Sequence, residues 1–244
     1  MAASRRRLAA FAAVVLLIGG AVASWAWHGR VSERPRLGLF TSLPIYWAES
    51  GSVGEALEGG GQRHWVRSAL EDAYVLVPLD TLDGPEAGPL DRLVMAQPRP
   101  LSPPENVALD QWVRKGGRLL LFADPFLTEE SRFAIGDKRR PQGAVLLSPI
   151  LTRWGLELTF DDRQGDEIDW VKYGGENLPE RLGGRWRLLP SSAGGACTVA
   201  AKGLVARCRV GNGSVLAIAD AAMLEADRDA TPAFKALTKQ AFAK

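Results

Sequence analysis

Four polar side chains follow predicted β-strands at positions where chemistry could occur. Thr41 and Ser42 follow the apolar run 37–40, Asp124 follows RLLLFA, and Asp220 follows VLAIA. Ligands of open α/β sheets bind beyond the carboxyl ends of the strands, so these four residues are the candidate ligand-pocket residues. The two carboxylates could form a general acid–base pair or bind a cation. Alternatively, each carboxylate caps the turn that follows its strand.

The sequence offers no nucleophile that these groups could activate. His64 could act as a general base, but no reactive side chain can be assigned beside it, and a solvated histidine on a helix face is the alternative. The chain contains no Gly-x-Ser-x-Gly motif, so a serine–histidine–aspartate hydrolase has no support. The glycine-rich segment 51–61 matches neither nucleotide-binding motif and is typical of a surface loop.

Two cysteines, Cys197 and Cys208, lie in β-rich runs that meet at Lys202 and Gly203. If those two residues form the turn of an antiparallel hairpin, the cysteines stand directly opposite each other. Opposed Cβ atoms lie about 4.5–5.5 Å apart, which is close to what a disulfide needs. The pattern predicts a structural disulfide, with two small buried thiols as the alternative. The absence of a Cys-x-x-Cys motif argues against redox chemistry.

The composition argues against several classes of ligand. Two cysteines and two histidines, all far apart, provide no metal site, and no cofactor is expected. The chain has 30 Lys and Arg side chains and 28 Asp and Glu side chains, and three of the positive ones are Arg5, Arg6 and Arg7. The remainder therefore has no excess positive charge with which to bind nucleic acid.

The N-terminal segment sets the predicted compartment. Residues 8–27 are uncharged and follow the three arginines; about 20 apolar residues in a helix span roughly 30 Å of membrane. The alternative is a cleavable signal peptide that ends at Ala21-Val22-Ala23. We expect a single-pass inner-membrane protein with its body in the periplasm, or a soluble periplasmic protein after cleavage. Residues 1–29 would be the anchor or signal, 30–36 a linker and 37–244 an extracytoplasmic domain.

Alternating strand and helix patterns must position the candidate residues. In the first half we expect strands at 37–40, 74–79, 92–96 and 118–123, and helices at 62–71 and from the capping box Ser102-Pro103-Pro104-Glu105 to Gly116. Strand–helix–strand units with short links indicate a parallel sheet. The second half begins with a polar surface excursion, 126–143. It continues with a helix at 149–154, strands at 156–160, 186–190, 196–201, 204–210 and 215–219, and a final helix after Thr231-Pro232.

Three stretches give the chain a family resemblance. LVMAQPRPLSPPENVALDQWVRKGGRLLLFADPFL, ILTRWGLEL and VGNGSVLAIADAAML resemble the gliding-motility auxiliary family, exported domains that accompany an uncharacterised ABC-type transport system. The resemblance covers about 37–242 and implies a fold similar to class I glutamine amidotransferase domains. Those enzymes carry a nucleophilic cysteine on a tight strand-to-helix turn, where this chain has Ala96-Gln97-Pro98 or Asp124-Pro125. The resemblance therefore implies a scaffold without amidotransferase chemistry.

These observations predict an α/β fold with a mostly parallel, flavodoxin-like sheet, helices on both faces and a C-terminal antiparallel extension. An N-terminal transmembrane or signal helix would precede it. The expected function is a non-catalytic, membrane-tethered accessory or ligand-binding module of an ABC-type transport or motility complex, with ATPase and permease subunits as partners. The alternative is an exported hydrolase in which Asp124 and Asp220 converge within about 5–9 Å of each other.

Overall fold

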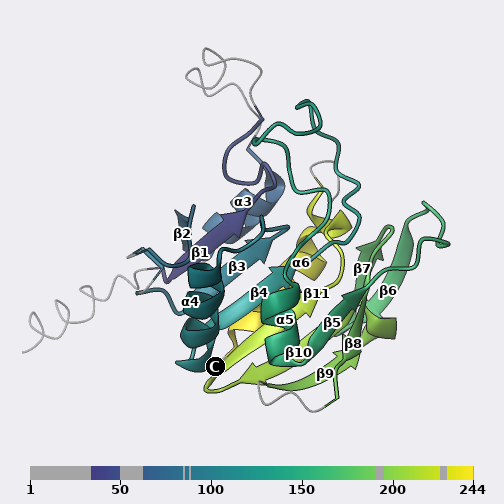
Figure 1. Cartoon of the computed structure of the whole chain (residues 1–244). Helices are drawn as coiled ribbons and strands as arrows, with labels where there is room; N and C mark the ends of the chain where they lie inside the picture. The colour runs from purple at the N-terminus through teal and green to yellow at the C-terminus, as the bar shows by residue number, and fades with distance from the viewer. Residues whose placement is uncertain are drawn as a thin grey trace, which may run out of the picture. The chain divides into compact units, whose positions relative to one another are not determined.

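A seven-stranded sheet forms the centre of the computed structural model, which describes residues 34–49, 63–84, 86–87, 89–190, 195–225 and 230–243. Its parallel strands lie in the order β2 (Val75–Pro78), β1 (Arg36–Thr41), β3 (Arg92–Ala96), β4 (Arg118–Phe122) and β11 (Gly213–Ile218). The sheet continues with β10 (Val205–Val210) and β9 (Ala196–Ala200) in antiparallel orientation (Figure 1). The prediction of a mostly parallel sheet with an antiparallel extension is confirmed.

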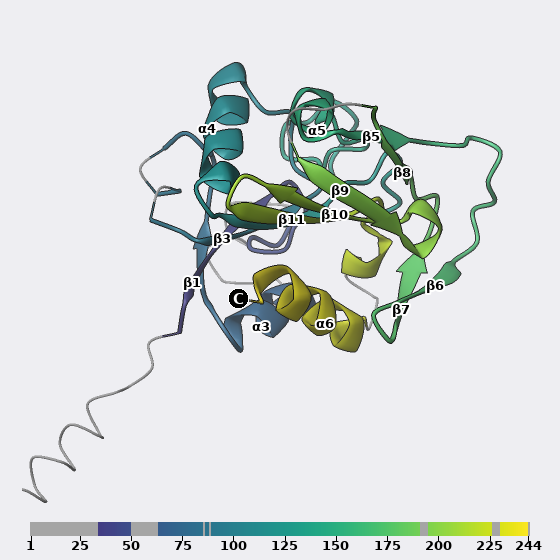
Figure 2. The ribbon, with the colours of Figure 1, turned by 90° about the horizontal axis from the view of Figure 1, so that it is seen from below.

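Helices cover both faces of this sheet (Figure 2). One face carries α4 (Pro103–Arg114) and α5 (Ser148–Trp154), and the other carries α3 (Trp65–Glu71) and α6 (Thr231–Phe242). Strands that are covered on both sides must be apolar along their whole length. In β4, all four residues from Leu119 to Phe122 are accordingly buried, and Phe122 stacks on Phe234 of α6.

The start of α4 follows directly from its sequence. The Ser102 side chain accepts a hydrogen bond from the Glu105 amide, and the Glu105 carboxylate accepts one from the Ser102 amide, so the predicted capping box is confirmed. Arg99 lies 2.7 Å from the same carboxylate. Its hydrogen bonds lower the pKa of Glu105 to about 2. Beyond the helix, Gly117 has no room for a side chain, because a Cβ there would lie 2.4 Å from the Trp112 ring.

Two small antiparallel sheets lie toward the β9 side of the molecule. One pairs β5 (Leu156–Thr159) with β8 (Arg185–Leu188), close to the predicted ranges, and the other pairs β6 (Asp169–Tyr173) with β7 (Glu176–Glu180). The sequence analysis missed the second pair. Only Val171 of β6 is buried, so the strand shows no alternation of apolar and polar residues, and β7 contains Pro179.

The hairpin between β9 and β10 forms around the predicted turn. Lys202 and Gly203 lie in the 3₁₀ turn η1 (Ala201–Gly203) and both have positive φ angles. The register places Cys208 opposite Cys197, and a disulfide joins the two side chains. The bond therefore ties the outermost strand of the main sheet to its neighbour.

The predicted anchor or signal, residues 1–29, lies outside the described residues, as does the glycine-rich segment 51–61. Every helix and strand among the described residues belongs to the unit that begins at Pro35. Within the part of the chain that the structure describes, no helix has both the length and the apolar character that crossing a membrane would require.

Candidate ligand site

The carboxyl ends of the parallel strands bring the predicted residues to one edge of the sheet. Strand order reverses between β1 and β3, because β2 lies on the far side of β1 and β4 on the far side of β3. Such a reversal opens a crevice where open α/β sheets bind ligands. Thr41 and Ser42 border this position from β1, and Gln97 borders it from β3.

Gln97, directly after β3, is held by hydrogen bonds of its side-chain amide. Its side chain is fully buried and its φ angle of 44° is rare for a residue other than glycine. The amide nitrogen donates to the carbonyls of Asp124, at 3.0 Å, and Gln142, at 2.8 Å, and the amide oxygen accepts from the Asp124 backbone N–H at 2.9 Å. Gln97 thus links β3, β4 and the segment around Gln142. From the sequence alone, Gln97 is visible only as a departure from the amidotransferase pattern, because its partners are distant in the chain.

The hydroxyls of Thr41 and Ser42 complete the same network. Thr41 Oγ1 donates to the Ala96 carbonyl at 2.8 Å and accepts from the Leu43 N–H at 2.9 Å. Ser42 Oγ donates to the Gln97 carbonyl and accepts from the Gln142 N–H at 3.0 Å. These contacts fix where the chain leaves β1.

Asp124 is completely buried at the end of β4. One carboxylate oxygen accepts from the Phe126 N–H at 2.8 Å, and the other accepts from the Ala221 N–H at 3.2 Å. Burial, helped by the nearby charge of Glu225, raises the pKa of Asp124 to about 7 against the opposing effect of those two hydrogen bonds. The carboxylate therefore closes a local turn and joins the ends of two neighbouring strands.

Asp220 behaves in the same way at the end of β11. Its carboxylate accepts hydrogen bonds from the Ala222 and Arg181 backbone N–H groups. Burial raises the pKa of Asp220 well above its usual value, and the nearby charge of Asp124 adds to this effect. The two aspartates are thus electrostatic neighbours, but each carboxylate is held by two backbone N–H donors, one from its own turn and one from another segment. These contacts favour the capping interpretation over an acid–base pair.

His64 also has a structural role that the sequence analysis did not predict. It is the N-cap of α3, where its Nδ1 accepts a hydrogen bond from the Val66 N–H at 3.2 Å. Burial lowers the pKa of His64. The half-buried imidazole therefore caps the helix through Nδ1.

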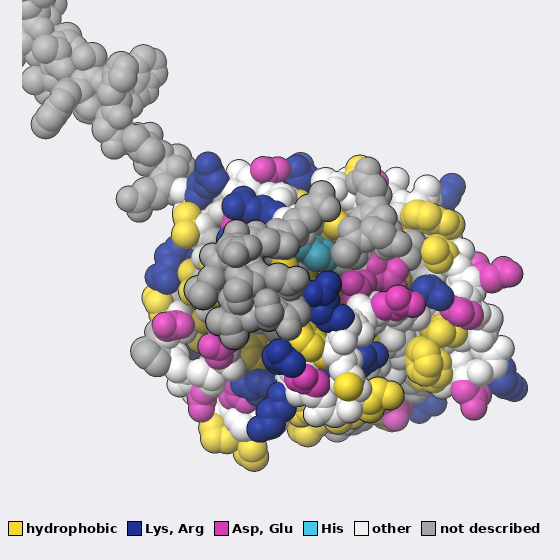
Figure 3. Space-filling view, turned by 90° about the horizontal axis from the view of Figure 1, so that it is seen from above, with side chains coloured by type: hydrophobic (Ala, Val, Ile, Leu, Met, Phe, Trp, Pro, Cys, Tyr) yellow, Lys and Arg dark blue, Asp and Glu magenta, His cyan; other side chains and the backbone are white. Residues whose placement is uncertain are grey.

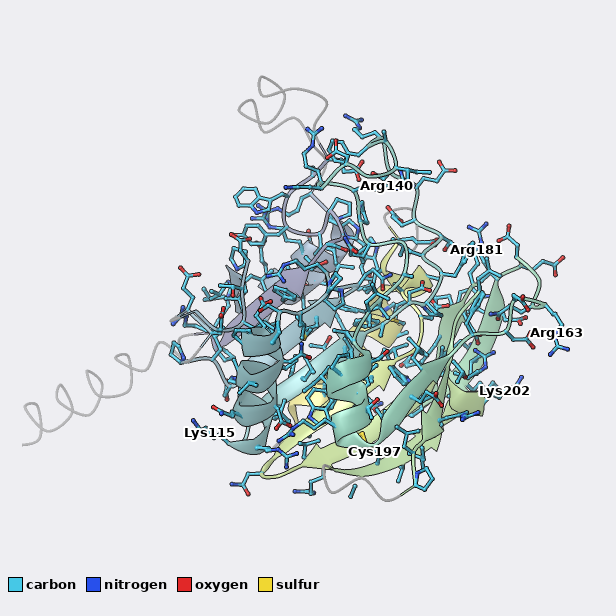
Figure 4. All side chains as sticks on the ribbon, in the orientation of Figure 1. Lys115, Arg140, Arg163, Arg181, Cys197 and Lys202 are labelled. Atoms are coloured by element: carbon cyan, nitrogen blue, oxygen red, sulfur yellow. A yellow bond between two sulfur atoms is a disulfide. The ribbon has the colours of Figure 1, made fainter. Side chains whose placement is uncertain are left out.

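Two loops extend from the edge of the sheet that carries this network. The β1 loop (residues 42–49) leaves β1, and the long loop (residues 124–145) connects β4 toward α5. Backbone hydrogen bonds close the neck of the long loop, from Leu127 N–H to the Gly143 carbonyl and from Val145 N–H to the Asp124 carbonyl, both at 2.9 Å. Ordered loops of this length usually serve binding or catalysis. Figure 4 shows Arg140 of this loop at the opposite end of the sheet from Cys197.

Glu49 ties the two loops together. Its carboxylate accepts from Ser131 Oγ at 2.6 Å and from the Arg132 N–H at 2.9 Å. Between the loops lies a cavity of about 280 Å³, which we call the loop pocket. The residues that line it include Thr41, Ser42, Tyr46, Trp47 and Glu49 on one side and Phe133 and Arg139 on the other. Two of the four predicted pocket residues therefore line a cavity, while Asp124 and Asp220 lie outside its lining.

The sequence analysis missed the aromatic lining of the loop pocket. Tyr46 packs edge-on against Trp47, with ring centroids 4.9 Å apart. Trp47 nevertheless leaves 73% of its surface exposed. Phe133 and Arg139 come from a segment almost a hundred residues later in the chain, so only the folded structure brings them to Trp47.

The described residues contain no group of three or more histidine, cysteine, aspartate or glutamate side chains arranged to hold a metal ion. This edge of the sheet therefore carries a cavity beside a network of hydrogen-bonded polar groups.

Comparison with solved structures shows a shared fold. An exo-β-1,4-mannosidase from Opitutaceae bacterium strain TAV5 is 15% identical, with a TM-score of 0.52; the match covers 89% of this chain and 37% of that enzyme. The chain thus spans little more than a third of that protein, and the likeness shows the fold alone. A putative ThuA-like protein from Bacteroides uniformis is 12% identical with a TM-score of 0.47, over 87% of this chain and 91% of that one.

A search of curated proteins found no match. A protein-family model described as "ABC-type uncharacterized transport system" matches residues 34–165, which is more than half of the chain and includes β1 to β5, the β1 loop and the long loop. The chain belongs to this family of ABC-type uncharacterised transport system proteins.

Proposed function

We propose that this chain is a non-catalytic accessory module of an ABC-type transport system, tethered to the membrane by its N-terminal segment, which binds a small ligand in the loop pocket. Membership of the family supports the association with a transport system. The loop pocket supports ligand binding, because it is a lined cavity at the edge of the sheet where α/β folds hold their ligands.

The main support for a non-catalytic role is the environment of Gln97. The strand order β2-β1-β3-β4-β11 matches the flavodoxin-like order and supports a scaffold similar to class I glutamine amidotransferases. In such a scaffold, the turn after β3 is a position for a strained nucleophile. Gln97 keeps the positive φ angle of such a turn, but it carries an amide whose ends are both hydrogen-bonded. The cysteines instead form a disulfide between β9 and β10.

The uncharged segment 8–27 and the disulfide together support a periplasmic location for the body. In this proposal, residues 1–29 form an inner-membrane anchor and the unit from Pro35 onward lies in the periplasm. If the leader is cleaved, the body is released as a soluble periplasmic protein.

Affinity purification of the full-length chain from cross-linked membranes tests this proposal. We expect an ATPase and a permease to co-purify, and we expect protease added to intact spheroplasts to digest the body. A variant that lacks residues 1–29 serves as the control for tethering. Recovery of the chain without transporter subunits, from membranes that contain them, would contradict the proposed association. If the purified chain turns over a substrate, and a single conservative substitution abolishes that turnover, the non-catalytic role is contradicted.

A further inference from the structure

The loop pocket combines aromatic side chains with charges that already have partners. The carboxylate of Glu49 accepts two hydrogen bonds from the long loop. Arg139 pairs with Asp137 at 2.7 Å. The lining contains one acidic and one basic side chain, Glu49 and Arg139, so it carries no net charge that would favour an anion or a cation. The lining therefore favours a ligand that carries no charge.

Side chains of both signs lie at this end of the molecule. Figure 3, which looks onto the end of the sheet where the loops lie, shows acidic, basic and hydrophobic side chains on the part of this face that is not drawn in grey.

Among the three aromatic rings of the lining, Trp47 is the one that remains open. The guanidinium of Arg67 lies 4.2 Å from the ring centre of Tyr46, and that of Arg139 lies 4.2 Å from the ring centre of Phe133. Each of those rings therefore has a covered face. Trp47 is braced edge-on by Tyr46 and is 73% exposed. A large exposed indole held in place by a neighbour is a platform for a flat, partly apolar ring.

Hydrogen-bonding capacity lies beside this platform. A carboxylate offers about four acceptor positions, and the described hydrogen bonds to Glu49 use two of them. The hydroxyls of Thr41 and Ser42, which also line the pocket, each donate one bond and accept one, so a second lone pair is left on each oxygen. The ligand should therefore present an apolar face to Trp47 and hydroxyl donors along its edge.

We infer that the loop pocket binds an uncharged carbohydrate whose pyranose ring stacks on Trp47. A pyranose has an apolar C–H face and a rim of hydroxyls, which is the combination that the lining requires. The cavity of about 280 Å³ is close to the lower limit of about 300 Å³ for small-molecule pockets, so it suits a mono- or disaccharide. This inference rests on the proposed ligand-binding function and names its substrate class.

Titration of the full-length chain tests the inference, in a zwitterionic detergent that contains no sugar. The probes are maltose, cellobiose, lactose, mannobiose and N,N′-diacetylchitobiose, with glucose 6-phosphate and glucuronate as charged counterparts. Binding is measured by saturation-transfer NMR and calorimetry. We expect at least one uncharged sugar to bind saturably and more tightly than either charged one. Failure of all five uncharged sugars to bind, or tighter binding of a charged one, would overturn the inference.

Variants locate the site. Replacing Trp47 with alanine should weaken binding on the order of tenfold, and Trp47→Phe should retain part of the affinity. Trp170, which is 59% exposed on β6 and does not line the loop pocket, provides the matched control. Trp170→Ala should leave the affinity unchanged. Equal loss in both alanine variants, or no loss in Trp47→Ala, would overturn the placement of the sugar.

The two proposals fail separately. Saturable sugar binding by a chain that never co-purifies with an ATPase or permease would remove the transport role and leave the ligand class in place. Co-purification with those subunits, without binding of any uncharged sugar, would leave the accessory role and remove the carbohydrate.

Discussion

At the scale of single residues, the buried carboxyl of Asp124 makes stability depend on pH. Its pKa of about 7 in the folded chain exceeds the value of about 3.9 in an unfolded chain, so folding favours the protonated form. The free energy of unfolding should therefore fall as the pH rises from about 4 to 7, with a slope of up to about 1.4 kcal/mol per pH unit. Asp124→Asn should be less stable overall, because it loses an acceptor for the Ala221 N–H, and should show a flatter pH dependence.

Denaturant unfolding at several pH values between 4.5 and 7.5 checks this expectation. Asp161→Asn is the control, because Asp161 is exposed and its pKa is lowered by Arg163, so its titration lies below this range. A wild-type chain that becomes more stable as the pH rises through this range would contradict the assignment.

Gln97 gives a second prediction at this scale. Gln97→Ala would leave the Asp124 N–H without its acceptor and would remove the donor to two buried or half-buried carbonyls. We expect a loss of about 2–4 kcal/mol in the free energy of unfolding, since each unsatisfied buried group costs about 1–3 kcal/mol. The exposed Gln111 of α4 is the control, and Gln111→Ala should change stability by less than about 0.5 kcal/mol. Equal effects of the two substitutions would show that the network is unimportant.

At the scale of elements, the ion pair between Arg99 and Glu105 at the start of α4 makes the free energy of unfolding depend on pH in the acid range. Arg99 lowers the pKa of Glu105 to about 2, so the carboxylate contributes stability above its unfolded pKa of about 4.3, and this contribution disappears as the pH falls toward 2. Glu105→Gln should cost about 1–3 kcal/mol at pH 7 and should reduce the loss of stability on acidification from pH 5 to 2. Ser102→Ala, which removes only the hydroxyl of the capping box, should cost about 1 kcal/mol and leave most of this acid loss in place, because Arg99 is the largest cause of the lowered pKa of Glu105.

The disulfide between β9 and β10 is the other element-scale feature that can be tested. Closing a loop of this size should stabilise the fold by about 3 kcal/mol. The double variant Cys197→Ala, Cys208→Ala should show that loss in denaturant unfolding, and alanine avoids placing a hydroxyl in the buried position of Cys208. The wild-type chain in reducing buffer should have the same free energy of unfolding as the double variant. Free thiols in chain isolated under non-reducing conditions would contradict both the bond and the proposed compartment.

The elements also show which parts of the fold a sequence can reveal. The bounds of β3 were predicted correctly, and so was the capping box of α4, because both depend on contacts within a few residues. The β6–β7 hairpin was missed because β6 buries a single side chain and Pro179 interrupts the usual strand pattern. Thr41 and Ser42 could be proposed as pocket residues because the end of a strand can be predicted from the local sequence. The loop pocket was not found, because Glu49 meets Ser131 only through tertiary folding.

At the scale of the whole molecule, the unit that begins at Pro35 contains every described helix and strand. We therefore expect residues 35–244 to fold without the preceding segment, because they contain the hydrophobic core of the described residues. Denaturant unfolding of this fragment should be a single cooperative transition with the same midpoint as the full-length chain in detergent. A fragment that binds hydrophobic dyes and lacks near-ultraviolet circular dichroism would contradict this expectation.

The closed neck of the long loop has a consequence for how such modules diversify. Leu127 is joined to Gly143, and Val145 to Asp124, by backbone hydrogen bonds that any sequence can make. Between these two pairs, Gln142 is held by Gln97 and Ser42, and Ser131 is held by Glu49, so only the residues outside these contacts can be exchanged without disturbing the strand ends. Gene duplication followed by change at those positions would yield proteins that share a scaffold and differ in the surface around the loop pocket.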